Sequence, residues 1–586
     1  LSFTLVPVLF KYLIRHSPET HTHGDWLETD PTNRRNIFSV IHRRFEHGFD
    51  RLRESYRHHL NWALSEPKQV IGFFALLMVS SLLLFPALGR DFFPDVDAGQ
   101  MRLHVRAPAG TRLEQTQADF ANVEAAIRQL VGAEQIDVIL DNIGLPYSGI
   151  NIALSDSATI GPMDGEILIA LKKEHAPTAE LMARLRQELP RRFASLQFFF
   201  QPADIVDQVL NFGAPAPVDI RISGPNSHDA YALAQKLTHD LNAIPGIVDA
   251  HVFQVPDAPA LTVNIDRTLA SQFGLNQQAA ASNVLVTTNS SAQTMPNFWV
   301  DPRNGVSYPL VVQEPSYHIA SAQDLWSLPV AAKGGAGQQL LMNVAGFSRA
   351  TVPMVLSQYN IRPVFDVNAN VQGRDLNSVA SDIDRVIAKD QPDKASALSV
   401  TLSGQVETMR QSYSGIFSGM AFAVVLVYLF LVINFQSWID PLIVLLAVPF
   451  ALGGVMWMLY LTQTHLSVPA LMGTLMCIGL TTANSILVVT FANQRLRDGH
   501  NDSWVAAEIA GYTRLRPVLM TAGAMILGMI PMALGIGEGG EQNAPLARAV
   551  IGGLLFATFA TLVFVPVMYR LLPHKTAPKG EPHVTA

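Results

Sequence analysis

The sequence predicts a polytopic α-helical membrane protein that carries a large α+β domain outside the membrane. Of its 586 residues, 49% are hydrophobic and only 15% are charged, which is too apolar for an ordinary soluble chain. Six apolar windows are long enough to cross a hydrocarbon core about 30 Å thick. One window stands alone, five follow one another in the last third, and residues 89–413 between them contain none.

The windows and their connections give the expected order of domains. Residues 14–67 are polar and basic, which predicts a linker with an amphipathic helix before the first span, at 68–88. The five remaining spans fall within 414–572, and a short tail, 573–586, follows them. The six windows are about Val70–Leu88, Ile416–Ile433, Pro441–Leu461, Val468–Ala492, Pro517–Ile536 and Ala549–Leu572.

Lys and Arg predict the orientation of the spans. They collect before the first span, between the fourth and fifth spans, and in the tail. Six crossings put these three zones on one side of the membrane, which is the cytoplasmic side by the positive-inside rule. We therefore expect both termini in the cytoplasm and residues 89–413 outside.

The external domain shows strand patterns that are followed by helical patterns. The segment "VDIRISG" at 218–224 alternates as a strand, and "HDAYALAQKLTHDLNAI" after it has helical periodicity. A later helix is predicted over 268–285. The recurring units predict ferredoxin-like βαβ sandwiches, one at 89–214 and one formed by 215–275 and 352–413. The stretch 276–351, rich in Asn, Ser, Gly and Pro, is expected to be an insertion.

Both ends of the chain carry a similar apolar motif. The start reads "VPVLFKYL" at 6–13, and the last span ends "VPVMYRLL" at 565–572. Internal repeats are common in transporters. We expect residues 1–13 to be the end of the last helix of a preceding repeat, and the chain to be the C-terminal half of a larger protein. Chance similarity between two apolar helix ends is the alternative.

The chemistry-bearing residues point away from an enzyme. There is no P-loop, dinucleotide fingerprint or paired His/Glu zinc motif, and the single Cys477 lies in an apolar run. We therefore expect no cofactor, no bound metal and no nucleic-acid partner. The fourth span carries clustered polar residues, which serve either helix packing or an ion path. They are Thr481, Thr482, Asn484 and Ser485.

Carboxylates are missing from the cores of the predicted spans. Asp440, Asp498, Asp502, Glu508, Glu538 and Glu541 all fall in links or at span ends. A proton-coupled carrier needs a titrating group within the membrane. If coupling occurs, another polypeptide segment must supply the acid.

Three consecutive phenylalanines, Phe198 to Phe200, stand in an expected strand of the external domain. Strand alternation places Phe199 on the face opposite its two neighbours. The run is either a strand buried on both faces or an aromatic wall of a cleft for apolar compounds.

Four stretches together resemble the resistance–nodulation–division (RND) efflux transporters, and their hydrophobe/amphiphile branch in particular. They are "FFPDVDAGQMRLHVRAPAGT", "NFQSWIDPLIVLLAVPFALGG", "GLTTANSILVVTFANQ" and "RLRPVLMTAGAMILGMIPMALGIGEG". The resemblance implies a trimeric proton antiporter of the bacterial inner membrane. It would pass hydrophobic or amphiphilic molecules to a periplasmic adaptor and an outer-membrane channel. The sandwiches would be porter subdomains, and the insertion would belong to a docking subdomain.

The resemblance also assigns candidate site residues. Arg514 and Thr521 match two members of the family's proton relay, and Asn484 stands beside Ala483, where the family has Lys. The relay's Asp pair would come from the N-terminal half. Cleft-lining positions of the family fall on His104, Arg106, Phe199 and Asp207, and Tyr147 lies in the expected switch loop.

Two alternatives remain open. A heavy-metal exporter of the same family would need Met pairs and acidic groups in the cleft, and only Met101 and Met163 are in that region. A truncated, non-transporting scaffold or accessory subunit is the second alternative.

Overall fold

The computed structural model forms two parts, 1–62 and 63–586, which are treated separately. It describes residues 37–572 except 95, 146–158, 205–207, 210, 212–213, 293–295, 316–317, 320, 332–337, 391–397, 498–501 and 538. The predicted repeat segment 1–13 and the tail 573–586 lie outside the described residues. Helix α2 (Ile37–Ser65) occupies much of the predicted linker.

Six helical segments of the described chain are long and apolar enough to cross a membrane, which confirms the predicted number. Five of them begin earlier than the apolar windows do, because a helix continues beyond the part that hydropathy detects. The segments are α3 (Pro67–Leu84) with η1 (Phe85–Ala87), α13 (Gln405–Phe435), α14 (Ile439–Leu445) with α15 (Val448–Leu461), α16 (Val468–Arg497), α17 (Ser503–Ala533), and η5 (Gly540–Gln542) with α18 (Ala544–Phe559), η6 (Ala560–Phe564) and α19 (Val565–Leu571).

Helices α15 and α18 approach each other through glycines. A Cβ atom on Gly454 would lie 2.4 Å from the carbonyl oxygen of Gly552, and one on Gly552 would lie 2.5 Å from the carbonyl oxygen of Gly454. Small residues allow such backbone contact between membrane helices. Any side chain at either position would push the two helices apart.

The first external sheet has the element order of a split βαβ unit. Its antiparallel strands lie in the order β2-β3-β1-β4. Alternate residues of β1, namely Met101, Leu103 and Val105, are buried in the apolar core. The elements are β1 (Gln100–Arg106), α4 (Leu113–Ile127), η2 (Arg128–Gly132), β2 (Ile136–Ile143), β3 (Asp164–Leu171), α6 (Thr178–Arg192) and β4 (Gln197–Gln201).

The second external sheet repeats this order with an interruption. Its strands lie in the order β13-β14-β5-β15, and β6 also pairs with β14. Val218, Ile220 and Ile222 of β5 form the core with α8 and α12. The elements are β5 (Val218–Ser223), α8 (Ser227–Leu241), β6 (Ile247–Val252), β13 (Ser357–Tyr359), β14 (Arg362–Val371), α12 (Leu376–Asp390) and β15 (Ser399–Gly404).

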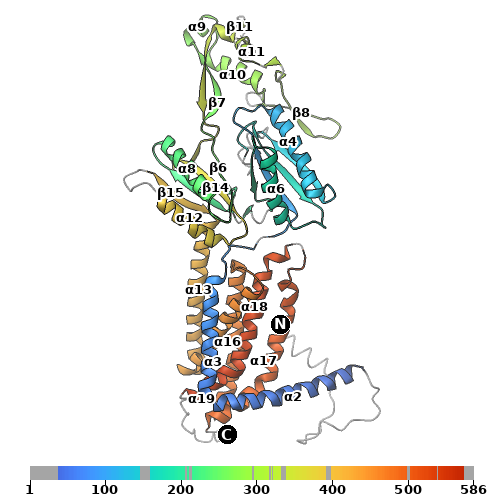
Figure 1. Ribbon diagram of the computed structural model, residues 1–586, viewed down its shortest axis with the longest axis vertical. Helices are drawn as coiled ribbons and strands as arrows, with labels where there is room; N and C mark the ends of the chain where they lie inside the picture. The colour runs from blue at the N-terminus through green and yellow to red at the C-terminus, as the bar shows by residue number, and fades with distance from the viewer. Residues whose placement is uncertain are drawn as a thin grey trace. The chain divides into compact units, whose positions relative to one another are not determined.

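The interruption leaves the second sheet on a two-stranded ribbon of β7 (Ala258–Ile265) and β12 (Ala345–Val352) (Figure 1). It therefore opens at β7, earlier than the insertion start predicted at residue 276. The ribbon carries α9 (Arg267–Gln272), α10 (Gln277–Thr288), β8 (Asn297–Val300), β9 (Ser307–Leu310), α11 (Ala322–Trp326), β10 (Pro329–Ala331), β11 (Gln338–Leu340) and η4 (Leu341–Asn343).

The single helix predicted over 268–285 is wrong. The chain breaks between α9 and α10, where Gly274 adopts a positive φ of 70° and the Asn276 side chain accepts a hydrogen bond from the backbone of Ala279. A glycine that ends one helix and an Asn cap that begins the next outweigh the continuous apolar periodicity.

Candidate functional site

The two external sheets each bury a polar face as well as an apolar one. Along β1, the residues between the core positions are Arg102, His104 and Arg106, and all three are buried. In the antiparallel register, His104 pairs with Glu166, and Arg106 with Asp164. The polar residues on these faces, which are buried except for the half-buried Arg221 and Asp366, are called the polar layer: Arg102, His104, Arg106, Asp164, Glu166, Asp219, Arg221, His251, Asp366 and Asn368.

The two carboxylates of the polar layer on the first sheet, Asp164 and Glu166, both have charged partners. Asp164 Oδ1 lies 2.5 Å from Nε2 of His104 and 3.2 Å from Nε of Arg106, and Oδ2 accepts from the backbone N–H of Ile160 at 3.0 Å. Arg102 donates to Glu166 at 2.8 Å. Burial alone would raise the pKa of both carboxyls, but hydrogen bonds and positive neighbours hold each pKa below its ordinary value. Both acids are therefore ionised at neutral pH.

A stack of three rings joins the two sheets. The ring of Phe199 lies 4.3 Å from that of His104 and 3.7 Å from that of His251, and Phe199 is 1% exposed. Phe200, with Phe198 beside it, belongs to the apolar core on the opposite face, which confirms the predicted alternation. The strand is buried on both faces, so His104, Arg106 and Phe199 form no open cleft wall here.

The second sheet supplies groups with shifted acidity. Burial and the neighbouring Asp366 carboxylate raise the pKa of Asp219 to about 6, although Arg221 lies 2.8 Å away. Asp366 in turn accepts a hydrogen bond of 2.6 Å from Gln254. Burial lowers the pKa of His251 to about 4, so its imidazole is neutral at physiological pH.

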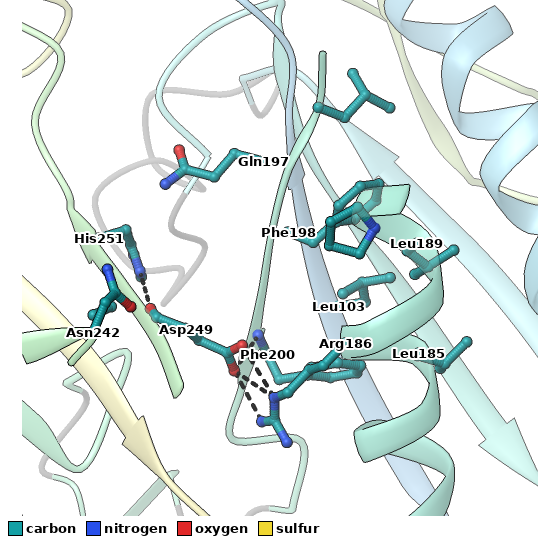
Figure 2. Close-up of a pocket in the computed structure, with 13 residues that line it drawn as sticks. Leu103, Leu185, Arg186, Leu189, Gln197, Phe198, Phe200, Asn242, Asp249 and His251 are labelled. Carbon is teal, nitrogen blue, oxygen red and sulfur yellow. Dashed lines mark hydrogen bonds and ion pairs between the residues drawn. The ribbon is translucent and has the colours of Figure 1, made fainter. Parts of the chain in front are cut away.

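A clamp centred on Asp249 connects the two sheets, and Figure 2 shows its contacts with Arg186 and Phe200. Asp249 Oδ2 accepts hydrogen bonds from Arg186 of α6, from the backbone N–H of Phe200 in β4 and from Asn370 of β14. The residue has a φ of 58°, a conformation that is uncommon for residues other than glycine. The clamp is defined as Asp249, Arg186, Phe200 and Asn370.

A cavity of about 310 Å³ lies next to the clamp (Figure 2). Its lining is mainly apolar, with leucine and phenylalanine side chains from β1, α6 and β4, and polar groups at one side. The apolar lining includes Leu103, Leu185, Leu189, Phe198 and Phe200.

In the candidate membrane helices, two of the three residues predicted for a proton relay, Asn484 and Thr521, are in contact. Thr521 of α17 donates to the side-chain oxygen of Asn484 of α16 at 3.2 Å. Arg514 instead lies over the ring of Phe491, 4.7 Å from its centre. Ala483, which the resemblance places at the family's Lys position, stands directly before Asn484.

The neighbouring hydroxyls favour the packing interpretation. Thr481 and Thr482 donate to carbonyl oxygens of their own helix. Ser485 and Thr561 join α16 to η6 through an oxygen–oxygen distance of 3.0 Å. Buried hydroxyls bonded in this way stabilise the helix contact.

One carboxylate at a span end is buried. Asp440 lies in the first turn of α14, as its sequence position predicts, and is 8% exposed. Asn493 of α16 donates to it at 3.0 Å, and Tyr569 of α19 donates to Asn493 at 2.7 Å. The burial was not predicted, because these partners come from helices far apart in sequence.

Several predictions cannot be placed. Tyr147 and Asp207 lie outside the described residues. Within the described ranges, no group of three or more His, Cys, Asp or Glu side chains could hold a metal ion. Met101 and Met163 are buried in the apolar core of the first sheet.

The sequence analysis did not identify Asp164, Glu166, Asp249 and His251 as site residues, although the spacing of "DGE" in β3 against "RLHVR" in β1 signals a paired polar face.

The family model for the AcrB/AcrD/AcrF family matches residues 1–573. The chain belongs to this family. This is the RND transporter family that the four sequence stretches resemble. A solved structure described as a heavy metal efflux pump matches with a TM-score of 0.75 at 24% identity, covering 90% of this chain and 52% of that one.

The curated relatives of this RND chain include proteins named for metal resistance and proteins named for multidrug resistance. Cobalt-zinc-cadmium resistance protein CzcA of Cupriavidus metallidurans is 28% identical over 88% of this chain and 48% of its own length. Multidrug resistance protein MdtC of Serratia proteamaculans is 24% identical over 97% of this chain and 52% of its own length. The chain spans about half the length of these relatives. The predicted hydrophobe/amphiphile branch is not specifically supported, since the metal-resistance protein matches at higher identity.

Proposed function

We propose that this chain is the C-terminal half of an RND permease that uses the proton gradient to export divalent transition-metal cations. The higher identity to proteins named for metal resistance carries the proposal. The working pump would be a homotrimer in the bacterial inner membrane, with the N-terminal half, a periplasmic adaptor and an outer-membrane channel. The external sheets would be its porter subdomains, and the β7–β12 excursion would belong to its docking subdomain.

The chemistry of the polar layer supports a cationic cargo. Its charged groups are three arginines and four carboxylates, so it carries one more negative than positive charge when all are ionised. The imidazole of His251 is neutral, as a metal ligand must be. Nitrogen and oxygen donors suit zinc, cobalt and nickel, and do not require the soft sulfur ligands of a copper(I) site. His104, Arg106, Phe199, Asp207 and Tyr147 would line this route once the sheets separate.

Export of amphiphilic organic molecules is the second candidate. The mainly apolar cavity of about 310 Å³ beside the clamp and the MdtC relatives favour it. Ligand pockets for organic molecules are apolar with few polar groups, which describes this cavity better than it describes the polar layer.

Resistance profiles separate the two candidates. The chain, expressed with the N-terminal half and its adaptor and channel in a metal-sensitive and dye-sensitive bacterial strain, should raise the tolerated concentrations of Zn²⁺, Co²⁺ and Cd²⁺ severalfold. Tolerance of dyes and detergents should remain unchanged. Resistance only to the organic compounds would establish the second candidate, and no resistance to either class would favour a non-transporting scaffold.

Within the membrane, we propose that Arg514, Thr521 and Asn484 form this half's part of the proton relay. The Thr521–Asn484 hydrogen bond supports a shared polar site, and Asn484 would replace the family's Lys as a neutral partner. The acids would come from the N-terminal half.

Arg514→Ala should therefore abolish export, lowering metal tolerance to that of the empty strain. Removing the guanidinium takes away the positive charge that the relay acids need. Arg516→Ala is the matched control, since Arg516 is exposed on the same helix, and it should leave tolerance within about twofold of the unsubstituted pump. Equal loss in both variants, at equal membrane abundance, would remove Arg514 from the relay.

A further inference from the structure

Three side chains of the second sheet stand in one row across adjacent strands. Asn368 of β14 pairs in register with Asp219 of β5 on one side and with His251 of β6 on the other. All three lie on the polar face, because the alternating residues Val218, Ile220, Val367 and Ala369 belong to the apolar core. Directly paired residues on one face have Cα atoms about 4.5–5.5 Å apart. Asn368 therefore lies between Asp219 and His251 and is the direct cross-strand neighbour of each.

Each member of the row has a buried atom without a hydrogen-bond partner in the described part of the protein. These atoms are Asp219 Oδ1, Asn368 Oδ1 and His251 Nε2, and the residues are 4%, 2% and 4% exposed. An unsatisfied buried polar atom costs about 1–3 kcal/mol, so such atoms are rare and call for an explanation. A carboxylate oxygen, an amide oxygen and an imidazole nitrogen in one row of three adjacent strands thus have unused lone pairs.

The orientation of His251 makes its free nitrogen an electron-pair donor. Nδ1 lies 2.7 Å from the backbone oxygen of Asp249, which has no hydrogen to donate. Nδ1 must therefore carry the proton, and Nε2 of the neutral ring keeps its lone pair. Histidines that bind metals commonly donate their other ring N–H to a backbone carbonyl in this way.

The clamp fixes the carbonyl that orients His251. Asp249 is held at its positive φ by hydrogen bonds from Arg186, Phe200 and Asn370. Its side chain thus ties the two sheets together, while its backbone oxygen sets the imidazole tautomer.

We propose that Asp219, Asn368 and His251 form a coordination site for a divalent transition-metal cation. The set supplies two oxygens and one nitrogen, which suits Co²⁺, Ni²⁺ or Zn²⁺. The site deepens the proposed function, on which the role of the cation as cargo rests. Charged groups around it are Arg221 and Asp366 on the same face and Arg106 on the first sheet, which is paired with Asp164.

Cobalt alone is the probe for this site. The purified full chain in detergent, titrated with Co²⁺, should develop a visible ligand-field absorption that saturates at one ion per chain. Asp219→Asn and His251→Phe should each weaken Co²⁺ binding at least about tenfold. Changing a residue that only supports a metal ligand weakens binding about 10–100-fold, and changing a ligand itself should cost no less. His239→Asn, on the exposed side of α8, is the matched control and should bind like the unsubstituted chain.

A substitution that is expected to strengthen Co²⁺ binding keeps the test decisive if Asp219→Asn or His251→Phe folds poorly. Asn368→Asp keeps the shape of the side chain and replaces a neutral oxygen ligand with a carboxylate. It should tighten Co²⁺ binding, which a purely structural role of Asn368 would not produce. No saturable absorption in the unsubstituted chain, or equal binding in all three variants, would overturn the site.

The same variants separate the site from the proposed function. Metal resistance that survives Asp219→Asn and His251→Phe would remove the site from the export route and leave metal export standing. Saturable Co²⁺ binding at the row, in a pump that confers resistance only to organic compounds, leaves the site and removes metal export.

Discussion

Gly552→Ala is expected to destabilise the membrane segment severely. The new methyl group would lie 2.5 Å from the carbonyl oxygen of Gly454 and 2.2 Å from Cβ of Met458. Overpacking usually costs about 1–3 kcal/mol. The upper end applies here, because one obstacle is the backbone of α15, which cannot change rotamer. We expect a much smaller yield of detergent-soluble protein and a lower thermal unfolding midpoint.

Gly479→Ala provides the matched control. Gly479 is also in a membrane helix, α16, but a Cβ atom there meets nothing within 4 Å. Alanine is a better helix former than glycine by about 1 kcal/mol, so this variant should be unchanged or slightly more stable. Equal behaviour of the two variants would mean that α15 and α18 are not packed backbone to backbone.

Asp249→Ala is expected to have the second largest effect. The substitution removes the acceptor of three groups and leaves the guanidinium of Arg186 without its carboxylate in a mostly buried position. Breaking a buried ion pair from one side costs about 3–5 kcal/mol. Amide hydrogen exchange measured by mass spectrometry should show faster exchange in β4 and β6, because the two sheets lose their common anchor.

An exposed ion pair on the same helix serves as the control for the clamp. Arg191 and Glu188 of α6 lie 3.3 Å apart with the arginine side chain 65% exposed. Glu188→Ala should change stability by less than about 1 kcal/mol and leave exchange in β4 and β6 unchanged. Faster exchange after both substitutions would indicate general loosening of α6 instead of a clamp.

Local patterns predicted the spans and the strands well, because their cause is local. A window such as Val468–Ala492 is apolar over its whole length, and the alternation in "MRLHVR" defines two faces of β1 without any knowledge of its neighbours. The same alternation placed Phe199 opposite Phe198 and Phe200. In each case, the period of the sequence equals the period of the backbone.

The sequence alone could not predict features that depend on contacts between distant segments of the chain. Whether the face carrying His104 meets water or a second sheet is decided by His251, on a strand far along the chain. The clamp likewise joins Arg186, Asp249 and Asn370 from three separate elements. The break at Gly274 was local but was hidden by apolar residues on both sides of it.

Helix α13 follows β15 directly, because Gly404 is the last residue of the strand and Gln405 is the first residue of the helix. This glycine has a φ of 80°, and a Cβ atom on it would lie 2.8 Å from the carbonyl oxygen of Pro217. No loop separates the two elements, so no flexible segment can absorb a displacement of β15. Such a displacement must move the N-terminal end of α13. At about 1.5 Å of rise per residue, its 31 residues make a rod more than 40 Å long, hinged at one glycine. Any movement of β15 would therefore be passed on to α13, the second of the candidate membrane spans.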